Sequence, residues 1–182
     1  MKFKVFRFKN VKSTNDTAIR ILRKNDYKFG MIISEKQNKG KGQYGRKWIS
    51  LKGNLFISFF YSLENLKIPI DRLTKFNCII VKRLIAQYYK KEILYKKPND
   101  LLIVKKKICG ILQETVYKFD KKFLIVGIGL NLIKSPNIKN ISAIIIDHIL
   151  KFPSFKIGHI DIIKKTTKKS IPNPLLLPFF FI

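Results

Sequence analysis

Apolar runs joined by very short polar turns fill the stretch between residues 101 and 132, and this pattern constrains the fold more than any other feature. The runs cover 101–104, 108–119 and 123–132, with lysines at 105–107 and Asp120-Lys121-Lys122 between them. Turns this short join antiparallel neighbours, because a parallel connection needs a crossover of about a dozen residues or more. The sequence therefore predicts antiparallel hairpins at the centre of the fold.

Further strand and helix signals place these hairpins in a larger sheet. Strands are expected over 1–8, at an edge, and over 31–34, 54–62 and 93–96, of which 54–62 has the strongest signal. The clearest helix is expected over 71–91, where apolar side chains recur at helical spacing. These side chains are Leu73, Phe76, Ile80, Val81, Leu84 and Tyr88. Runs of strands with helices between them predict an α+β fold, a sheet covered by helices on one face.

A second helix is predicted to start at Ser13. Its hydroxyl can cap a helix that runs to about Arg23, and Asp16 stands near the acidic position of a capping box. Taken alone, Ser13-Thr14-Asn15 is explained as a helix cap. The same NH groups and hydroxyls would also suit an anion or the polar head group of a ligand, so both interpretations stay open.

Length and composition suit one folded domain with its own core, since the chain has 182 residues and 46% hydrophobic residues. No stretch approaches the ~20 apolar residues of a membrane span. Lys and Arg interrupt every apolar run before Ile19, unlike in a signal peptide, so a cytoplasmic location is expected. Cys78 and Cys109 with two His predict neither a disulfide framework nor a Cys/His metal cluster, and Cys109 is expected in the core.

Composition changes near residue 134. Eight of the nine glycines lie before this point and five of the seven prolines lie after it. We therefore expect one domain over 1–140 and a poorly defined tail over 141–182, with at most a short helix at 142–151.

The formal charge of +27 suggests a nucleic-acid-binding module. The excess comes from 32 Lys against 6 Arg, although arginine is the residue that forms phosphate and base forks. Lysine also accompanies 30 Ile and 12 Asn, which A/T-rich codons encode. Much of the basicity is therefore explained without a nucleic-acid surface, although the charge would still favour acidic partners and phosphate-bearing ligands in a salt-dependent way.

The loop from Gly40 to Arg46 is the most informative local motif. Its three glycines let the backbone approach a ligand closely, and Lys41, Arg46 and Lys47 surround them with positive charge. Trp48 adds a large apolar face. The loop matches neither a Walker loop nor a dinucleotide fingerprint. In isolation it is equally well explained as a mobile basic surface loop.

The order of the motifs is more specific than any one of them. Ser-Thr-Asn at 13–15 precedes Gln-x-x-Gly-x-Gly-x-x-Gly-Arg-x-Trp at 37–48, Lys-x-Pro-Asn-Asp at 96–100, Lys-x-x-Gly-Ile-Leu at 107–112 and Gly-x-Gly-x-Asn at 127–131. Over about residues 8–133 the chain resembles the catalytic domain of biotin protein ligases. The resemblance implies a class II synthetase-like α+β domain with a mixed, largely antiparallel sheet backed by helices.

The resemblance also implies roles for individual residues. Those implied for the biotin site are Ser13, Thr14, Asn15, Gln37, Lys41, Gly42, Gln43 and Lys96. Those implied for ATP and the adenylate are Gly40, Lys41, Gly42, Gly45, Arg46, Lys47, Trp48, Asn99 and Asn131. Lys96 matches the family's essential lysine and is the implied catalytic residue, and no side chain is assigned as a metal ligand.

The implied reaction joins biotin to ATP as an acyl-adenylate and passes the biotin to a lysine of a biotin carboxyl carrier protein. Because the biotin carboxylate must meet the α-phosphate, a fixed cation between these anions would stabilise the transition state, a role suited to Lys96. Mg²⁺ would neutralise the departing pyrophosphate. The glycine-hinged loop would shield the reactive anhydride from water.

Departures from the family pattern lead to further expectations. Lys41 and Gln43 replace two arginines of the usual loop, and because neither forms a two-pronged phosphate fork, we expect a looser hold on the adenylate. Lys97 stands where tryptophan is usual. A C-terminal β-barrel domain is not recognisable, and the motifs begin at Ser13, so no DNA-binding domain and no repressor role are expected.

Three alternatives stay open. A lipoate or octanoate ligase would share the fold, but its loop typically reads Arg-Arg-x-x-Gly-Gly-Gly, which is absent here. A basic nucleic-acid-binding module would bind DNA with a steep salt dependence. A third alternative keeps the fold but has lost turnover. A homodimer formed through an edge of the sheet is also expected from the resemblance.

Overall fold

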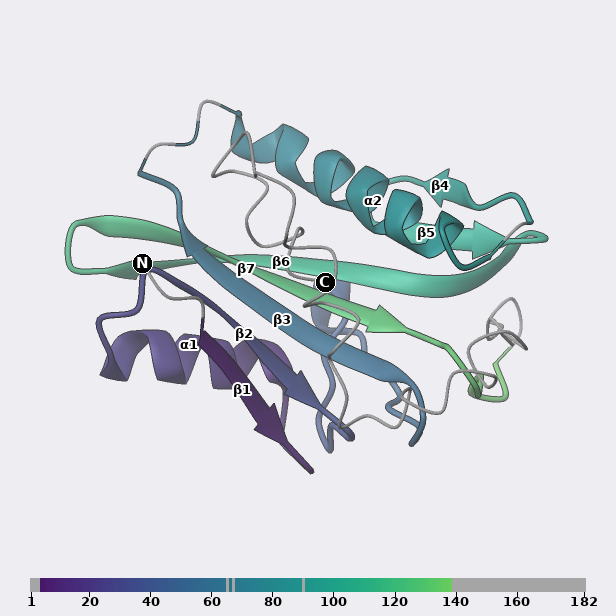
Figure 1. The fold of residues 1–182 in the computed structure, drawn as a ribbon, viewed down its shortest axis with the longest axis horizontal. Helices are drawn as coiled ribbons and strands as arrows, with labels where there is room; N and C mark the ends of the chain where they lie inside the picture. Colours follow the sequence, from purple (N-terminus) through teal and green to yellow (C-terminus); the bar gives the residue numbers. More distant parts are fainter. Residues whose placement is uncertain (1–3, 65, 67, 90, 139–182) are drawn as a thin grey trace.

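The computed structural model describes residues 4–138 except 65, 67 and 90. They form one seven-stranded sheet and two α-helices (Figure 1). The strands are β1 (Lys4–Phe8), β2 (Phe29–Ser34), β3 (Leu55–Ser62), β4 (Leu94–Lys96), β5 (Asp100–Ile103), β6 (Lys106–Lys118) and β7 (Lys121–Leu130). The helices are α1 (Thr14–Lys24) and α2 (Ile70–Ala86), with a short 3-10 turn, η1 (Gln43–Gly45).

The strand order is β1-β2-β3-β7-β6-β5-β4, so β1 is an edge strand as predicted. Only the β1–β2 pair is parallel and the other pairs of this sheet are antiparallel, which confirms the mixed, largely antiparallel sheet. The predicted hairpins are also present. The turn between β5 and β6 is shorter than predicted, since it holds Val104 and Lys105 at positive φ while Lys106 and Lys107 belong to β6.

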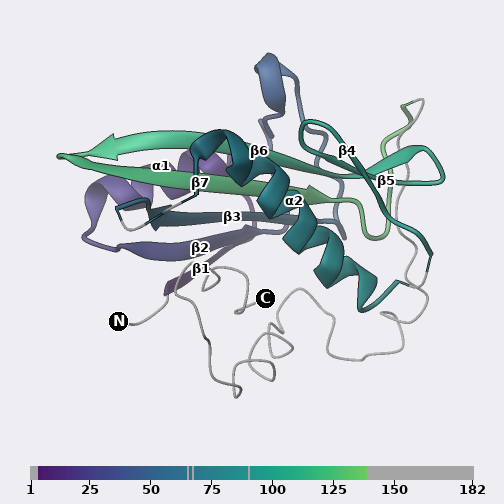
Figure 2. The ribbon, with the colours of Figure 1, turned by 90° about the horizontal axis from the view of Figure 1, so that it is seen from above.

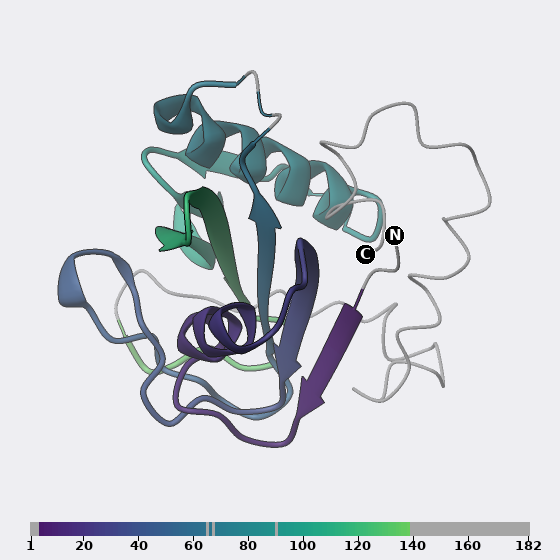
Figure 3. The same ribbon diagram turned by 90° about the vertical axis from the view of Figure 1, so that its left-hand side faces the viewer.

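The two helices cover opposite faces of the sheet, so the prediction of one covered face is wrong (Figure 3). On β3, Phe59 packs in the cluster beneath α2, whereas its neighbour Phe60 packs in the cluster beneath α1. The physical reason is visible in β3 itself. Its nearly unbroken apolar run has no polar face to leave in water, and a strand of this kind requires cover on both sides.

Helix α1 begins as predicted. Ser13 is its N-cap and its hydroxyl accepts a hydrogen bond from the backbone NH of Asp16 at 3.4 Å. Asp16 in the first turn and Arg23 and Lys24 in the last turn match the polarity of the helix dipole. Helix α2 crosses the other face, as seen from above in Figure 2, and ends at Ala86 rather than at the predicted residue 91.

The described residues form a single unit around this sheet, and no helix among them is long and apolar enough to cross a membrane. Cys78 and Cys109 are free and buried in the core beneath α2, as predicted for Cys109. Within the same described ranges no cluster of three His, Cys, Asp or Glu side chains could hold a metal ion. The predicted tail over 141–182 and its short helix lie outside the described residues.

Candidate active site

A cavity of about 480 Å³ opens on the α1 face of the sheet. Its walls come from the start of α1, the loop after β2, the β4–β5 turn and the ends of β6 and β7. Thirteen of the predicted site residues line it: Ser13, Thr14, Asn15, Gln37, Lys41, Gly42, Gln43, Arg46, Lys47, Trp48, Lys96, Asn99 and Asn131. The fold therefore brings together side chains that lie more than a hundred residues apart in the sequence. Gly40 and Gly45 do not line the cavity.

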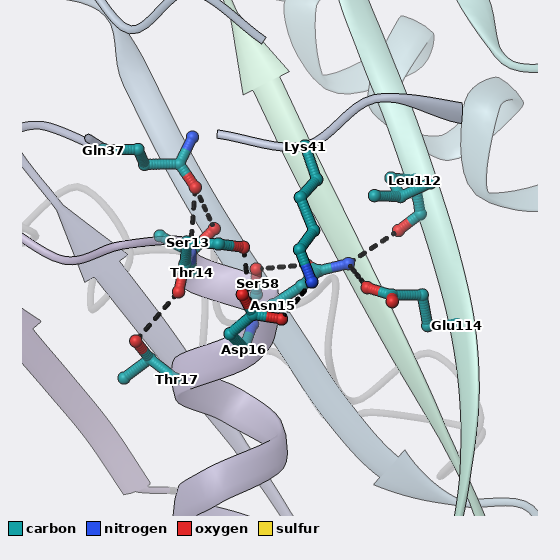
Figure 4. Close-up of polar contacts among 10 residues, drawn as sticks. All are labelled: Ser13, Thr14, Asn15, Asp16, Thr17, Gln37, Lys41, Ser58, Leu112 and Glu114. Carbon is teal, nitrogen blue, oxygen red and sulfur yellow. Dashed lines mark hydrogen bonds and ion pairs between the residues drawn. The ribbon is translucent and has the colours of Figure 1, made fainter. Parts of the chain in front are cut away.

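Asn15 is held rigidly at the buried start of α1 (Figure 4). Its amide donates to a carboxylate oxygen of Glu114 at 2.6 Å and to the carbonyl of Leu112 at 3.4 Å. Its own oxygen accepts from the hydroxyl of Ser58 at 2.5 Å. The side chain lies directly on Gly127, where an added Cβ would stand 2.3 Å from the Asn15 oxygen. Two strands, β3 and β6, thus fix the orientation of one amide, and a glycine on β7 makes room for it.

Gln37 ties the loop after β2 to the start of α1. Its side-chain oxygen accepts from the backbone NH of Thr14 at 2.8 Å and from the Thr14 hydroxyl at 3.0 Å. Its amide nitrogen donates to the Ser50 hydroxyl at 3.1 Å. Thr14 and Gln37 therefore form a fixed, uncharged polar part of the cavity wall.

Lys41 lies at the boundary between this uncharged pocket and the loop. Its ammonium forms an ion pair with Asp16 at 2.5 Å, and both side chains remain partly exposed (Figure 4). The hydrogen bond with Asp16 raises the pKa of Lys41, with a further contribution from the charge of Glu114. Lys41 is therefore cationic at neutral pH, and an anionic ligand would compete with Asp16 for it.

The Gly40–Trp48 loop is a small hairpin. Trp48 donates its backbone NH to the carbonyl of Gly40 at 2.9 Å, and Gly42 donates to the carbonyl of Arg46 at 2.7 Å. A Cβ on Gly40 would stand 2.5 Å from the carbonyl oxygen of Trp48. Gly40 therefore acts by letting the two arms of the hairpin close, and Gly45 supplies the positive φ at its tip.

Trp48 packs across the glycines of the sheet. A Cβ on Gly129 would stand 2.5 Å from its ring, and one on Gly110 would stand 2.7 Å away. The Lys107 ammonium lies 5.4 Å from the ring centroid. The indole NH is buried and lacks a hydrogen-bond acceptor among the described residues. A group buried in this way costs free energy unless a ligand or water supplies a partner.

Lys107 is a cavity cation that the sequence analysis did not single out. It pairs with Asp100 at 2.7 Å, and its side chain is only 28% exposed. A β-bulge explains its direction, because Leu101 faces Cys109 whereas Leu102 faces Lys107, so that Ile108 has no partner on β5. Strict alternation would have placed Lys107 on the α2 face with Cys109. The bulge turns it toward the cavity instead.

Lys96 ends β4 at the mouth of the cavity. Its side chain is exposed and makes no hydrogen bond or ion pair with any part of the chain that the structure describes. Asn99, in the following turn, donates its amide to the carbonyl of Ile111 at 2.7 Å and accepts the backbone NH of Ile111 at 2.9 Å. The turn is therefore well anchored, whereas the Lys96 ammonium is free to follow a ligand.

Asn131 is buried where β7 leaves the sheet, and Asn54 holds this segment in place. The Asn54 oxygen accepts three successive backbone NH groups, those of Leu132, Ile133 and Lys134, each at 3.1 Å. Its amide donates to the carbonyl of Lys134 at 2.6 Å and to the Asn131 side chain at 3.3 Å. One buried side chain thus orders the wall that carries Asn131.

Sequence reasoning missed four residues of this site: Ser58, Glu114, Asn54 and Lys107. The first three touch other side chains of the site rather than standing in a recognisable motif, so no local signal marks them. Lys107 is the first residue of the Lys-x-x-Gly-Ile-Leu motif, and that motif could have identified it as a site residue.

Comparison with protein families gives a match over most of the described residues. The model of the Biotin/lipoate A/B protein ligase family matches residues 7–131. The Bifunctional ligase/repressor BirA of Bacillus subtilis is 32% identical over 130 residues, 69% of this chain and 39% of that protein. BirA of Escherichia coli is 33% identical over 102 residues, 55% of this chain and 32% of that protein. The chain thus spans between about a third and two fifths of the length of these relatives.

Solved structures show the same fold. A biotin protein ligase from Aquifex aeolicus in complex with biotin and ATP is 29% identical, with a TM-score of 0.65 over 77% of this chain and 58% of that chain. A biotin protein ligase from Leishmania major in complex with biotin aligns with a TM-score of 0.66 at 22% identity, over 82% of this chain and 64% of that chain. The second likeness concerns the fold alone.

Proposed function

The chain belongs to the biotin/lipoate A/B protein ligase family, and we propose that it joins biotin to ATP as biotinyl-5'-AMP and transfers the biotin to a lysine of a biotin carboxyl carrier protein. One observation carries this proposal. A single cavity joins a buried pocket of uncharged hydrogen-bonding groups to a cationic region beside Trp48. The reaction needs these two environments side by side. The names of the relatives and the biotin and ATP complex of the Aquifex aeolicus ligase support the same assignment.

The uncharged pocket suits the ring end of biotin. The urea group of that ring presents N–H donors and a carbonyl acceptor, and Ser13, Thr14 and Asn15 are all at most 4% exposed. Buried polar groups of this kind discriminate well between ligands. A ligand that leaves them unpaired binds more weakly, because their desolvation is then not compensated by hydrogen bonds. Asn15 and Gln37 are fixed by the protein, so the pocket is preorganised rather than assembled on binding.

The cationic region suits the nucleotide. Lys41, Arg46 and Lys47 lie on the loop and can meet phosphate oxygens, while the Trp48 ring offers a flat apolar wall. Asn131 also lines the cavity, where its amide can bond a phosphate or ribose oxygen. Gly42 and Gln43 line the same cavity at the loop.

For the activation step we propose Lys107 ahead of Lys96, the residue that the resemblance implies as catalytic and that also lines the cavity. Transition-state stabilisation depends on charges that are already in position before the reaction. Lys107 is held between Asp100 and the Trp48 ring, whereas Lys96 is exposed at the mouth of the cavity. We therefore assign Lys107 to the space between the biotin carboxylate and the α-phosphate, and Lys96 to the phosphates that leave.

The chemistry then needs no protein nucleophile. A carboxylate oxygen of biotin attacks the α-phosphorus, and the bond to the bridging oxygen breaks as pyrophosphate departs with its electron pair. In the second step the neutral amine of the acceptor lysine attacks the acyl carbon. AMP leaves with the electron pair of the acyl–oxygen bond, and the amine proton passes to solvent. Positioning and electrostatics supply the acceleration.

Mg²⁺ is expected to enter with ATP rather than to occupy a site built by the protein. Mg²⁺ is commonly bound by substrate phosphates, water and one or two carboxylates. Asp100 is the one carboxylate among the described residues that line the cavity, and it is already paired with Lys107. The cavity therefore suits a Mg²⁺ ion that enters bound to the ATP phosphates and would neutralise part of their charge.

The alternatives remain distinguishable. A lipoate or octanoate ligase would need an apolar channel for the acyl chain, whereas the pocket at Ser13, Thr14 and Asn15 is polar. We also propose a homodimer through β1, which pairs only with β2 among the described residues, and action in the cytoplasm. Light scattering across a dilution series would test the dimer.

Transfer of biotin to a carrier domain tests the proposal. Purified protein, biotin, Mg-ATP and a biotin carboxyl carrier domain should give biotinylated carrier, measured by mass spectrometry. Lys107→Ala should lower the rate roughly 100-fold or more, as expected for loss of a preorganised charge, and Lys96→Ala should have a smaller effect. Transfer of lipoate instead of biotin would exclude the proposed substrate. Unchanged rates in both variants would exclude the proposed roles of these lysines.

A further inference from the structure

Cationic side chains surround the cavity, and acidic side chains are almost absent from it. Among the described residues that line it, one is acidic, Asp100, and six are cationic. The six are Lys41, Arg46, Lys47, Lys96, Lys105 and Lys107. Asp100 is paired with Lys107, and Asp16, which does not line the cavity, is paired with Lys41. The other four cations have no acidic partner among the described residues, so the lining carries a net positive charge.

The positive charge continues onto the surface around the mouth. Lys12 and Lys39 are exposed beside the loop and are joined by a backbone hydrogen bond from Lys39 to Lys12 at 2.8 Å. Lys97 is exposed next to Lys96. None of these three lines the cavity. We call Lys12, Lys39 and Lys97 the cationic rim.

The opposite end of the sheet is also rich in lysine but is not charged in the same way. At the β6–β7 turn, Lys118 pairs with Asp26 and Lys121 pairs with Glu64, each at 2.9 Å. Asp120 stands in the turn itself. A lysine-rich composition would add cations to both ends. The difference lies in the acids, because segment 36–48 contains none and segment 96–107 contains only Asp100.

This charge distribution has a consequence for the second step of the proposed reaction, on which the inference rests. ATP brings several negative charges, but pyrophosphate removes most of them when the adenylate forms. The bound adenylate keeps only the charge of its single phosphate group. The cavity and its rim are then strongly positive when the acceptor arrives, and the acceptor lysine is itself cationic in water.

We infer that the acceptor lysine is presented on an acidic protein surface, whose carboxylates face the cationic rim. Like charges in juxtaposition across an interface cost several kcal/mol, whereas complementary ones speed association. A surface with carboxylates around the target lysine would therefore dock where a neutral or basic surface would be rejected. The positive cavity also favours the neutral form of the incoming lysine, which is the nucleophile.

Charge reversal on the rim tests this inference. The variant is Lys39→Glu with Lys97→Glu, two exposed positions outside the proposed catalytic machinery. The matched control is Lys24→Glu with Lys28→Glu, which makes the same change of charge at exposed positions at the far end of α1. The acceptor probe is a folded biotin carboxyl carrier domain with acidic residues around its lysine. Hydroxylamine serves as a small neutral acceptor that needs no docking.

The expected result is a fall of roughly tenfold in kcat/KM for the carrier domain in the rim variant at low salt, because rim charges act mainly on the association rate. The loss should shrink in 0.5 M salt, about where screening becomes strong. The control pair and the hydroxylamine rate should change less than about twofold. A carrier domain whose flanking carboxylates are replaced by amides should lose rate with the unaltered protein.

Two outcomes would overturn the inference, and they are separable from failure of the proposed function. Equal kcat/KM values for the rim variant and the control variant would show that the rim does not select the acceptor. A rim variant that also slows the hydroxylamine reaction would place the effect in the cavity rather than at docking. Absence of biotin-dependent ATP–pyrophosphate exchange in the unaltered protein would instead overturn the proposed function itself.

Discussion

The two faces of the sheet are built from the same strands but have different roles: one is packed as a core, and the other carries the cavity. On β7, Ile128 and Leu130 pack into the core beneath α2, while the alternating Gly127 and Gly129 lie on the α1 face under Asn15 and Trp48. The α2 face is filled with large side chains, and the cavity end of the α1 face is floored by glycine. One strand can therefore supply both stability and a binding site, since its successive side chains point to opposite faces.

The largest expected effect comes from a substitution on the filled α2 face, which should lower stability but leave biotin binding nearly unchanged. Leu124→Ala removes a side chain that is 1% exposed in the α2 core, and should lower the free energy of unfolding by about 3 kcal/mol through loss of burial and the cavity left behind. Urea unfolding measures this loss. The biotin KM of the folded protein should stay within about twofold. A large change in biotin KM would show that the two faces are not independent.

A side chain added on the floor of the cavity should act mainly on biotin binding. Gly127→Val places a side chain where even a Cβ would stand 2.3 Å from the Asn15 oxygen. Overpacking of this kind costs roughly 1–3 kcal/mol, so biotin should bind about ten- to a hundredfold more weakly. Isothermal titration with biotin measures the effect. Val126→Ala is the control, because it alters the preceding residue on the other face, which does not line the cavity, and should leave biotin affinity unchanged.

Substitution of Asn54 should have a smaller effect, confined to the binding of ATP. Asn54→Ala removes the acceptor of three backbone NH groups in the segment that carries Asn131, and should raise the KM for ATP about tenfold, as expected from one or two lost hydrogen bonds. Biotin affinity, measured separately, should hardly change. Asn54→Asp keeps the acceptor oxygen and should have a weaker effect. An equal loss of ATP and biotin affinity would mean that Asn54 supports the whole fold instead.

The smallest expected effect concerns the loop. Gln43→Arg adds a side chain able to form a two-pronged phosphate contact, and should lengthen the lifetime of the enzyme-bound adenylate by about a few fold. Release of labelled adenylate into solution measures this lifetime. Tyr44→Arg adds the same charge at a neighbouring residue that does not line the cavity, and should have little effect. Equal lifetimes in the unaltered protein and Gln43→Arg would contradict the expected looser hold.

Much of this organisation could be predicted from the sequence, because it rests on local signals. The strand runs, the short turns and the Ser13 cap are set by neighbouring residues, and the structure has all of them. The gathering of Ser13, Gln37, Trp48 and Asn131 around one cavity followed from the order of motifs.

The remainder depends on contacts that no local pattern contains. The second covered face was missed because the apolar run of β3 fits a one-sided or a two-sided strand until its partners are known. Lys107 was missed because the bulge at Ile108 breaks the alternation by which its direction would be read. Glu114 and Asn54 act on distant side chains, at sequence separations of 99 from Asn15 and 77 from Asn131.

Formation of the adenylate tests the central claim most directly. Purified protein should be mixed with biotin and Mg-ATP without any carrier, and the products of a single turnover separated and identified by mass spectrometry. Biotinyl-5'-AMP and pyrophosphate should appear in equal amounts with the unaltered protein, and far more slowly with Lys107→Ala and Gly127→Val. No biotinyl-5'-AMP from a folded protein, or formation by both Lys107→Ala and Gly127→Val at the rate of the unaltered protein, would contradict the assignment of this cavity as the active site.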